Sequence, residues 1–276
     1  MIGVLMNNRG SELGFKDFRR YFPHTPAALC IKECARLTAL RKHGCTSPVL
    51  DVGCGDGLFA SIAFEGIEAW GIDIDAGDGR WAAASKAYSQ VVLGDVTKAQ
   101  LPQSFFETCV ANCSLEHVPR IDLALQNIWR SLKPGGRVLM FVPNREWAEH
   151  LLSYRLLEAL GATSLATTLR DAVDTVFQHH HLYDDAGWHQ VVTDAGFEVD
   201  GVEPVLSTAT TVAFEVFLLP SLAGWVNKHL TTRWTNFPGA RRAFALPVYA
   251  LAKLLVDAGD PSPTAEFLVT AHRPHP

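Results

Sequence analysis

The sequence has few cysteines, and none of them stands at the spacing of a zinc or redox pair. All six lie in the first half of the chain, and no two form a C-x-x-C pair. We see no secretory signal peptide before them. Because an isolated cysteine is commonly a small buried hydrophobe, we expect reduced thiols, a cytoplasmic protein and no metal site.

Positive charge is also scarce. The 276 residues include 24 Lys and Arg against 29 Asp and Glu, which gives a formal charge of −5. The basic residues form no dense stripe, since Arg19-Arg20 and Arg241-Arg242 are only pairs. This balance argues against nucleic acid as the main partner. The sequence also lacks internal repeats and clear linkers, so we expect a single domain over residues 1–276.

The most informative stretch that is present runs from Val49 to Ala60, VLDVGCGDGLFA. A short apolar run that contains Asp51 is followed by glycines at alternate positions, Gly53, Gly55 and Gly57. Glycine lets the backbone turn tightly and approach a ligand closely. Apolar residues then return at helical spacing, so the glycines connect a strand to a helix. An α/β sheet binds nucleotide-like cofactors at such a loop.

Two cofactor classes fit this loop. Gly55, Gly57 and Ala60 match the G-x-G-x-x-A tail of a dinucleotide fingerprint, so a nicotinamide-dependent oxidoreductase is an alternative. Asp51 favours the other class, because it precedes the first glycine by two residues, where a dinucleotide fold needs no charge. The acid and the glycines together resemble motif I of the class I S-adenosylmethionine-dependent methyltransferases.

Further segments continue the resemblance. Asn112 to Val118 and the turn at 132–137 are similar to later parts of the methyltransferase pattern. Residues 179–197 are similar to a segment of the type 11 methyltransferase family. The resemblance covers residues 48–143 well and the insertion after residue 205 poorly.

The order of expected elements is that of an α/β fold. Strands alternating with helices imply a parallel sheet that is covered on both faces. We expect strands at 48–52, 68–73, 90–93, 107–112, 137–142, 197–206 and 265–272. We expect helices at 57–65, 80–87, 121–132, 146–160, 164–177 and 184–196, after an N-terminal helix that begins near Pro26 and ends before Gly44.

The resemblance implies a Rossmann-like sheet of seven strands, mostly parallel with an antiparallel last strand, with helices on both faces. On this view a helical lead at 11–45 precedes a core at 46–143 and 179–206. A final strand at 264–273 completes the sheet. Helical insertions at 145–178 and 207–262 interrupt the core.

The same resemblance assigns S-adenosylmethionine as the methyl donor and names the residues that hold it. Asp51 is placed to bind the ammonium group, and backbone carbonyls near Asn112 and Cys113 accept from the same group. Asp73 follows the second strand and suits the ribose diol, while Asp95 suits the adenine amino group. The full expected set is Asp51, Gly53, Cys54, Gly55, Gly57, Asp73, Ile74, Asp95, Val96, Asn112 and Cys113.

Catalysis needs few side chains in such an enzyme. Methyl transfer from a sulfonium is an in-line displacement, for which alignment in a dry site supplies much of the acceleration. A base is needed only where the acceptor loses a proton. His117 and His179 are the candidate catalytic residues, and a structural role in shaping the pocket is the alternative for His117. Consecutive side chains point in different directions, so the run His179 to His181 predicts no metal site.

The apolar insertion is the least typical part of the chain. Thr208 to Val226 contains one charge, Glu215, and we expect Pro220 to interrupt it. A second helix is expected after Pro238-Gly239. We expect lid or packing helices here; peripheral membrane contact or a homodimer through 208–257 are the alternatives.

Three functions fit these observations. The first is S-adenosylmethionine-dependent methylation of a small-molecule or lipid-like acceptor. The second is the nicotinamide-dependent oxidoreductase, and the third is a non-catalytic S-adenosylmethionine-binding partner protein. O-, N- and C-methylation share one scaffold, so the acceptor atom stays open.

Overall fold

The computed structural model describes residues 12–262 and 265–276, which form two compact units. The helical unit comprises the described part of Met1–Ala39 with Ala148–Asp171 and Val205–Ala265. The sheet unit comprises Leu40–Trp147, Ala172–Pro204 and Glu266–Pro276. Ser11 and Thr264, where the expected lead and the expected final strand begin, lie outside the described residues.

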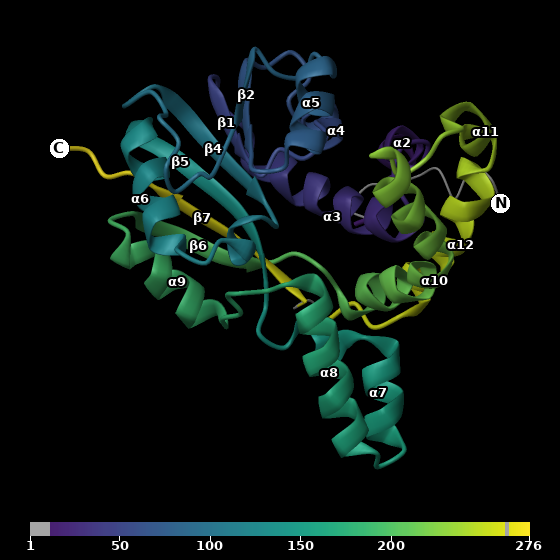
Figure 1. Ribbon diagram of the computed structural model, residues 1–276. Helices are drawn as coiled ribbons and strands as arrows, with labels where there is room; N and C mark the ends of the chain where they lie inside the picture. The colour runs from purple at the N-terminus through teal and green to yellow at the C-terminus, as the bar shows by residue number, and fades with distance from the viewer. Residues whose placement is uncertain (1–11, 263–264) are drawn as a thin grey trace. The chain divides into compact units, whose positions relative to one another are not determined.

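A seven-stranded sheet forms the centre of the sheet unit (Figure 1). The strand order is β3-β2-β1-β4-β5-β7-β6; β7 is antiparallel to both of its neighbours, and the other pairs are parallel. The predicted fold class is therefore confirmed. The strands are β1 (Val49–Val52), β2 (Ala69–Asp73), β3 (Gln90–Leu93), β4 (Phe106–Asn112), β5 (Leu132–Pro143), β6 (Glu198–Pro204) and β7 (Glu266–His272).

Helices cover both faces of this sheet. α4 (Leu58–Ala63) and α5 (Ala76–Ala84) lie on one side, and α6 (Ile121–Ser131) and α9 (Asp185–Asp194) lie on the other (Figure 1). Helix α6 buries one apolar stripe, because its buried residues recur at intervals of three and four. A short 3-10 helix, η1 (Leu115–His117), follows β4. The carboxyl ends of β1, β2, β3 and β4 consequently lie at one edge of the sheet.

The helix expected at 146–160 is divided into the 3-10 helix η2 (Trp147–His150) and α7 (Leu152–Ala159). Two other boundaries differ from the prediction by four residues or more. The segment at 132–137 was expected as a turn, but β5 already begins at Leu132, opposite Phe106, and its register shifts before Arg137 pairs with Thr108. Helix α5 begins at Ala76 rather than at residue 80. The Asp75 carboxylate caps the helix by accepting from backbone N–H groups of the first turn. The prediction used the spacing of apolar residues, which does not reveal such a cap.

The helical unit is built from helices of three separate parts of the chain. α2 (Phe15–Tyr21) was not expected as a separate helix, and the second helix of the insertion is divided into two. The remaining elements are the first part of α3 (Ala27–His43), the end of η2 (Trp147–His150), α7 (Leu152–Ala159), the first part of α8 (Thr163–Phe177), α10 (Thr208–Thr231), α11 (Pro238–Ala243) and α12 (Ala245–Ala258).

The expected interruption at Pro220 was wrong, because α10 continues through it. Proline removes one backbone N–H, which leaves the carbonyl four residues earlier without its helical partner. That carbonyl belongs to Val216, whose side chain is exposed, so water can satisfy it. At the start of α10 the Ser207 hydroxyl accepts from the Thr210 N–H and caps the helix.

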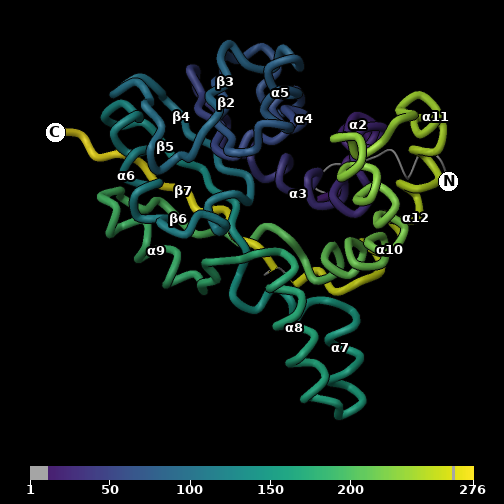
Figure 2. The backbone as a smooth tube through the Cα atoms, viewed as in Figure 1, coloured from purple at the N-terminus to yellow at the C-terminus, as the bar shows by residue number. Residues whose placement is uncertain are grey.

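Helix α12 is the centre of packing in the helical unit. Its Tyr249 is fully buried, with the rings of Phe15 and Phe18 at 5.0 and 5.5 Å, and its hydroxyl donates to the Leu13 carbonyl at 3.2 Å. α10 packs beside α12, as the backbone trace also shows (Figure 2). These contacts fix α2, α10 and α12 against one another.

Candidate functional site

The glycine loop turns sharply at the end of β1. Gly53, Gly55 and Gly57 have φ of 76°, 53° and 81°, in the left-handed region that side chains rarely adopt. The N–H groups of Gly53 and Cys54 both donate to the Ile72 carbonyl, at 2.8 and 3.1 Å. The loop is therefore tied to the end of β2.

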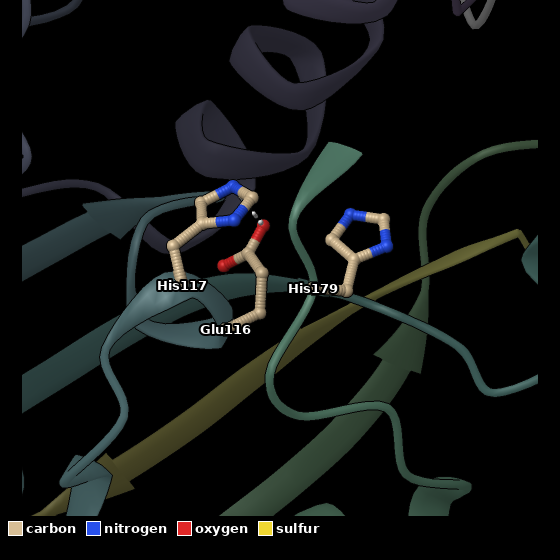
Figure 3. A group of neighbouring side chains, drawn as sticks. All are labelled: Glu116, His117 and His179. Carbon is tan, nitrogen blue, oxygen red and sulfur yellow. Dashed lines mark ion pairs between the residues drawn. The ribbon is translucent and has the colours of Figure 1, made fainter. Parts of the chain in front are cut away.

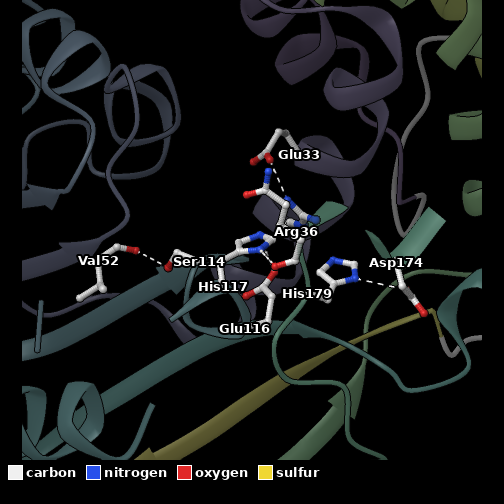
Figure 4. A network of polar contacts seen from close by, with 9 residues as sticks. Glu33, Arg36, Val52, Ser114, Glu116, His117, Asp174 and His179 are labelled. Carbon is white, nitrogen blue, oxygen red and sulfur yellow. Dashed lines mark hydrogen bonds and ion pairs between the residues drawn. The ribbon is translucent and has the colours of Figure 1, made fainter. Parts of the chain in front are cut away.

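Gly53 also lies too close to the end of β4 to carry a side chain. A Cβ atom added there would lie 2.3 Å from the Cβ of Ser114. The Ser114 hydroxyl in turn donates to the Val52 carbonyl at 2.6 Å (Figure 4). The carboxyl ends of β1 and β4 are thus held together at the floor of the site.

Asp51 is buried beneath this loop. The residue is 1% exposed, and its carboxylate accepts a 2.6 Å hydrogen bond from the hydroxyl of Tyr88. Burial, and then the charge of Asp51, raise the pKa of Tyr88, so the phenol stays protonated and remains a donor. A hydrogen bond within the protein therefore fixes Asp51 next to the glycine loop, which the motif associates with a cofactor.

Asp73 stands at the end of β2, facing the same loop. One carboxylate oxygen accepts from the Gly55 N–H at 2.7 Å, and the other accepts from the Asp75 N–H at 2.8 Å. A carboxylate has about four lone-pair positions. Asp73 can therefore be fixed by two backbone groups and still accept from the two hydroxyls of a ribose.

Asp95 follows β3 and is held in a similar way. Its Oδ1 accepts from the N–H and the hydroxyl of Thr97, at 2.9 and 2.7 Å, and its Oδ2 lies 3.4 Å from Nζ of Lys98. The hydrogen bonds from Thr97, and then the nearby Lys98, lower the pKa of this carboxyl. Asp95 is therefore ionised at neutral pH and is purely an acceptor.

These strand ends open into one pocket of about 640 Å³. Of the expected cofactor residues, the ones that line it are Gly53, Asp73, Ile74, Asp95, Val96 and Cys113. His117 also lines it. The structure does not place the other expected residues in the lining; these are Asp51, Cys54, Gly55, Gly57, Asn112 and His179.

The pocket fits the expected donor chemically. Two carboxylates, Asp73 and Asp95, stand at successive strand ends, where the sequence resemblance predicts acceptors for a ribose and for the adenine amino group. Ile74 is 76% exposed and Leu123 also reaches the surface, so apolar side chains are available to cover a base. The amide of Asn127 donates to the Val96 carbonyl at 2.8 Å and fixes the backbone beside Asp95. S-adenosylmethionine matches this set of groups.

His117 stands at the edge of the pocket on η1 (Figure 3). Its Nδ1 lies 3.2 Å from the Gln178 carbonyl, which can only accept, so Nδ1 carries the proton. Its Nε2 lies 3.6 Å from Oε1 of the buried Glu116. A protonated His117 ring would therefore form an ion pair with Glu116.

His179 lies beside His117 rather than in the pocket. The two rings stack with centroids 5.4 Å apart. Nδ1 of His179 lies 3.4 Å from Oδ1 of Asp174 (Figure 4), which also accepts a 2.8 Å hydrogen bond from the Trp147 indole. Asp174 thus orients His179, and His179 packs on the imidazole that faces the pocket.

The three histidines from His179 to His181 make different contacts. The backbone N–H groups of His180 and His181 both donate to the Glu116 carbonyl, at 2.9 and 3.1 Å. The His181 ring lies between the Val118 carbonyl and the Tyr183 hydroxyl, at 3.0 and 3.1 Å. Among the described residues, the set that could hold a metal ion is instead Glu116, His117 and His179, whose ligand atoms lie within 4.8 Å of one another.

Comparison with known families shows to which class of protein the chain belongs. A family profile described as a methyltransferase domain matches residues 21–202. The chain belongs to this methyltransferase family. Its sheet order and its glycine loop are those of the class I S-adenosylmethionine-dependent enzymes, as the sequence predicts. The match supports a methyltransferase over the nicotinamide-dependent alternative.

Individual relatives match about a third of the chain. An uncharacterized methyltransferase of Mycobacterium tuberculosis is 36% identical over 94 residues, covering 33% of this chain and 48% of that protein. A ubiquinone biosynthesis O-methyltransferase of Alkalilimnicola ehrlichii is 33% identical over 113 residues, covering 38% of this chain and 45% of the other. The chain spans about half the length of the curated relatives it matches.

A solved structure supports the fold. The [4+2]-cyclase SpnF is 19% identical, with a TM-score of 0.55 over 88% of this chain and 82% of that one. At this identity the likeness shows the fold alone, and its name also shows that the fold hosts other reactions.

Several residues of the methyltransferase site were not predicted from the sequence. Tyr88 holds Asp51 across 37 residues of chain, and Asp174 orients His179. Thr97 was not expected to fix Asp95, although its place two residues after an acid in a turn is a usable signal. Ser114 lies within the segment that resembles the family, but its contact with Gly53 has no sequence signature.

Proposed function

We propose that this protein transfers a methyl group from S-adenosylmethionine to a small-molecule or lipid-like acceptor. The observation that carries the proposal is the single pocket in which Gly53, Asp73 and Asp95 meet at the ends of β1, β2 and β3. Each supplies what one part of the donor needs: close backbone approach, acceptors for a diol and an acceptor for an amino group. The family match supports the same reaction.

The protein's own groups have limited tasks in this reaction. When bound, the donor supplies an electrophilic methyl group on a sulfonium. The glycine loop, Asp73 and Asp95 hold and orient that donor, and the apolar lining excludes water. His117 reaches the pocket from the end of β4 and takes the proton where the acceptor is a hydroxyl, with Glu116 stabilising the charged ring.

The acceptor class that we favour is a hydroxylated, largely apolar molecule. One relative is an O-methyltransferase of ubiquinone biosynthesis, which makes a hydroxyl the first acceptor to test. The histidine beside the pocket supports the same choice, because a hydroxyl acceptor needs a base and a tertiary amine does not. N- and C-methylation are the other outcomes of the same screen.

Calorimetric titration tests the donor. We expect S-adenosylmethionine and S-adenosylhomocysteine to bind and NAD not to bind. Asp73→Asn removes a charged acceptor, and hydrogen bonds to charged groups contribute about 1.5–3 kcal/mol, so affinity should fall roughly tenfold or more. Asp194→Asn, on the exposed side of α9, is the matched control. Binding of NAD in place of S-adenosylmethionine would overturn the proposal.

Turnover separates catalysis from mere binding. The purified chain, supplied with isotopically labelled methyl donor, is offered hydroxylated aromatic amphiphiles, amines and unsaturated lipids in parallel, and products are identified by mass. A labelled methyl ether, formed as the hydroxyl loses its proton, supports the favoured class. Tight donor binding without transfer to any class would favour the non-catalytic partner protein.

A further inference from the structure

The second half of α10 exposes apolar residues that nothing in the helical unit covers. Leu219 is 76% exposed and Leu230 is 80% exposed, while Val216 and Val226 are also exposed. These residues recur at intervals of three, seven and four, so they share one face of the helix. The first half of α10 is different, since Phe214 and the residues before it are largely buried. The start of α10 therefore packs inside the helical unit, whereas its end is exposed.

Helices α11 and α12 expose a second apolar set. Phe237 and Phe244 flank α11 on either side, and Phe244 is 64% exposed. Leu251 and Leu254 continue from Phe244 along one face of α12 and are exposed as well. Because α12 packs beside α10, the two exposed sets lie on neighbouring helices. We call these residues of α10, α11 and α12 the apolar surface.

A basic pocket adjoins this surface. It has a volume of about 690 Å³ and lies between α2 and α11. Four cationic side chains line it, Lys16, Arg19, Arg20 and Arg242, together with one acid, Asp17, which is buried. Lys16, Arg19 and Arg242 are exposed. A pocket with this lining suits an anionic group such as a phosphate.

Fixed contacts join the basic pocket to the apolar surface. The guanidinium of Arg241 donates to the carbonyls of Phe22 and Thr25, at 3.0 and 2.8 Å, and lies 4.3 Å from the centre of the Phe22 ring. Arg241 thus ties α11 to the end of α2. Its neighbour Arg242 lines the pocket, two residues before the exposed Phe244. The two arginines of α11 therefore lie between the exposed Phe237 and Phe244.

From these observations we propose that the helical unit docks on the surface of an anionic lipid bilayer. The apolar surface enters the interface, and the basic pocket of α2 and α11 holds the phosphate of a lipid headgroup. Local charge complements such a surface: residues 208–257 contain five Lys and Arg against two Asp and Glu, although the whole chain is negative. Exposed Trp225, Phe237 and Phe244 match the aromatic preference of membrane interfaces.

The geometry favours lying on the bilayer over crossing it. Among the described residues, α10 is long and apolar enough to span a membrane by length and composition, which for one helix is weak evidence. A third of its most apolar window is buried, and its start packs inside the helical unit. Only the exposed half is available to lipid, as in interfacial helices.

A second copy of the chain fits this surface less well. A two-fold interface brings the same patch of both copies together. Docking through the apolar surface would then bring two equally basic pockets to the same interface, and each pocket lining offers only the buried Asp17 as a counter-charge. An anionic bilayer supplies the missing negative charge and covers the apolar side chains at the same time.

Vesicle sedimentation of the full chain tests the proposal. The chain should pellet with vesicles of phosphatidylcholine mixed with phosphatidylglycerol and only weakly with phosphatidylcholine alone. High salt should weaken binding, because the screening length falls from about 10 Å at 0.1 M to about 3 Å at 1 M salt. Binding is also measured in inorganic phosphate and in chloride at the same ionic strength. This comparison distinguishes a site for a lipid headgroup from a site for free phosphate.

Paired variants separate the two contributions. Arg19→Glu with Arg242→Glu should weaken partition to anionic vesicles by at least tenfold, since each basic residue near such a surface contributes about 1 kcal/mol. Leu219→Ser with Leu230→Ser should weaken binding to a similar degree without removing its salt dependence. Arg130→Glu on α6 and Leu160→Ser after α7 make the same chemical changes at exposed sites elsewhere, and should bind as the natural chain does.

Circular dichroism and donor titration show that each variant is folded, and the assay itself needs no turnover. The proposal is overturned if the natural chain ignores anionic vesicles or binds neutral ones equally well. It is also overturned if phosphate alone abolishes binding at constant ionic strength. A stable dimer in sedimentation velocity, with no vesicle binding, would assign the apolar surface to a second copy instead.

Discussion

The hydroxyl of Tyr88 lies 2.6 Å from Oδ2 of the buried Asp51 and donates to it. The tyrosine ring is partly exposed, but its hydroxyl reaches inward to a carboxylate that is 1% exposed. The same hydroxyl lies 3.4 Å from the Cys54 carbonyl, within the glycine loop. Tyr88 therefore connects the acid of the cofactor motif to the loop that follows it.

Removing this hydroxyl should destabilise the protein. In Tyr88→Phe the buried Asp51 carboxylate loses a donor, and such a loss costs about 1–3 kcal/mol. We expect the free energy of unfolding, measured by urea denaturation, to fall by that amount, and donor affinity to fall because the loop is less fixed. Tyr154→Phe on α7 removes a hydroxyl that makes no hydrogen bond to the part of the chain that the structure describes, and it should change neither quantity. Equal stabilities for the two variants would show that the Tyr88 bond is dispensable.

The contact between Gly53 and Ser114 makes a second prediction. Gly53→Ala combines an unfavourable left-handed φ of 76° with a Cβ only 2.3 Å from that of Ser114. Gly66→Ala is the matched control, because φ there is 78° and no atom lies within 4 Å of the added Cβ. Both variants should lose about 1–2 kcal/mol of unfolding free energy, because alanine is strained at a left-handed φ. Gly53→Ala should lose roughly 1–3 kcal/mol more from overpacking.

A double variant then identifies the cause. Adding Ser114→Gly to Gly53→Ala removes the clashing atom and should restore part of the lost stability, whereas Ser114→Gly added to Gly66→Ala should only destabilise. Thermal or urea unfolding of the four variants measures the coupling. Additive losses at Gly53 and Ser114 would contradict the contact.

Much of the sheet unit could be predicted because its signals are local. The strand after Pro48, the glycines and the acids at successive strand ends are short patterns in the sequence, and β3 was predicted with its observed bounds. Tyr88 has no such pattern. It lies in a loop, and the position of its hydroxyl depends on how β1 and β3 are arranged in the sheet.

The helical unit was less predictable because its contacts are long-range. Pro220 is a local helix breaker, but tertiary packing of α10 outweighs one missing N–H. Helix α2 has seven residues, too few for a periodic pattern, and its position depends on Tyr249, more than two hundred residues later. In the sheet unit, the stack of His117 on His179 is also a long-range contact, and no spacing in the sequence indicates it.

The two histidines should affect turnover but not donor binding. His117→Ala removes the candidate base and should lower turnover about 10²–10⁴-fold for a hydroxyl acceptor, the usual contribution of general base catalysis. His179→Ala should have a smaller effect, because His179 only positions His117. His189→Ala on the exposed side of α9 is the control. Calorimetry should show unchanged S-adenosylhomocysteine affinity in all three.

Two further measurements separate positioning from other roles. Asp174→Asn weakens the group that orients His179, so it should shift the pH profile of turnover in the same direction as His179→Ala. Chelation by EDTA should leave turnover unchanged if the histidines act as base and support. Loss of turnover with EDTA, restored by a divalent cation, would instead make Glu116, His117 and His179 metal ligands. Unchanged turnover in His117→Ala would remove it from the mechanism.

Cys45 gives a prediction about pH. Burial raises the pKa of this thiol to about 11, although the positive charge of Arg137 acts in the opposite direction. The thiolate is the reactive form. In the folded chain, alkylation of Cys45 by iodoacetamide should therefore keep accelerating with pH up to about 11, whereas in urea it should level off near the ordinary value of 9.

The sign for stability follows from the same shift. The unfolded chain loses the Cys45 proton at lower pH than the folded chain does, so the contribution of this thiol to stability is complete below pH 9 and is lost as the pH rises towards 11. In Cys45→Ser, the unfolding free energy should fall less steeply between pH 9 and pH 11. Between pH 7 and pH 8 this site should add no pH dependence to the unfolding free energy. Peptide mass spectrometry of the alkylated chain measures the rate at Cys45 alone. Equal rate–pH curves in buffer and in urea would show that the folded protein does not shield this thiol.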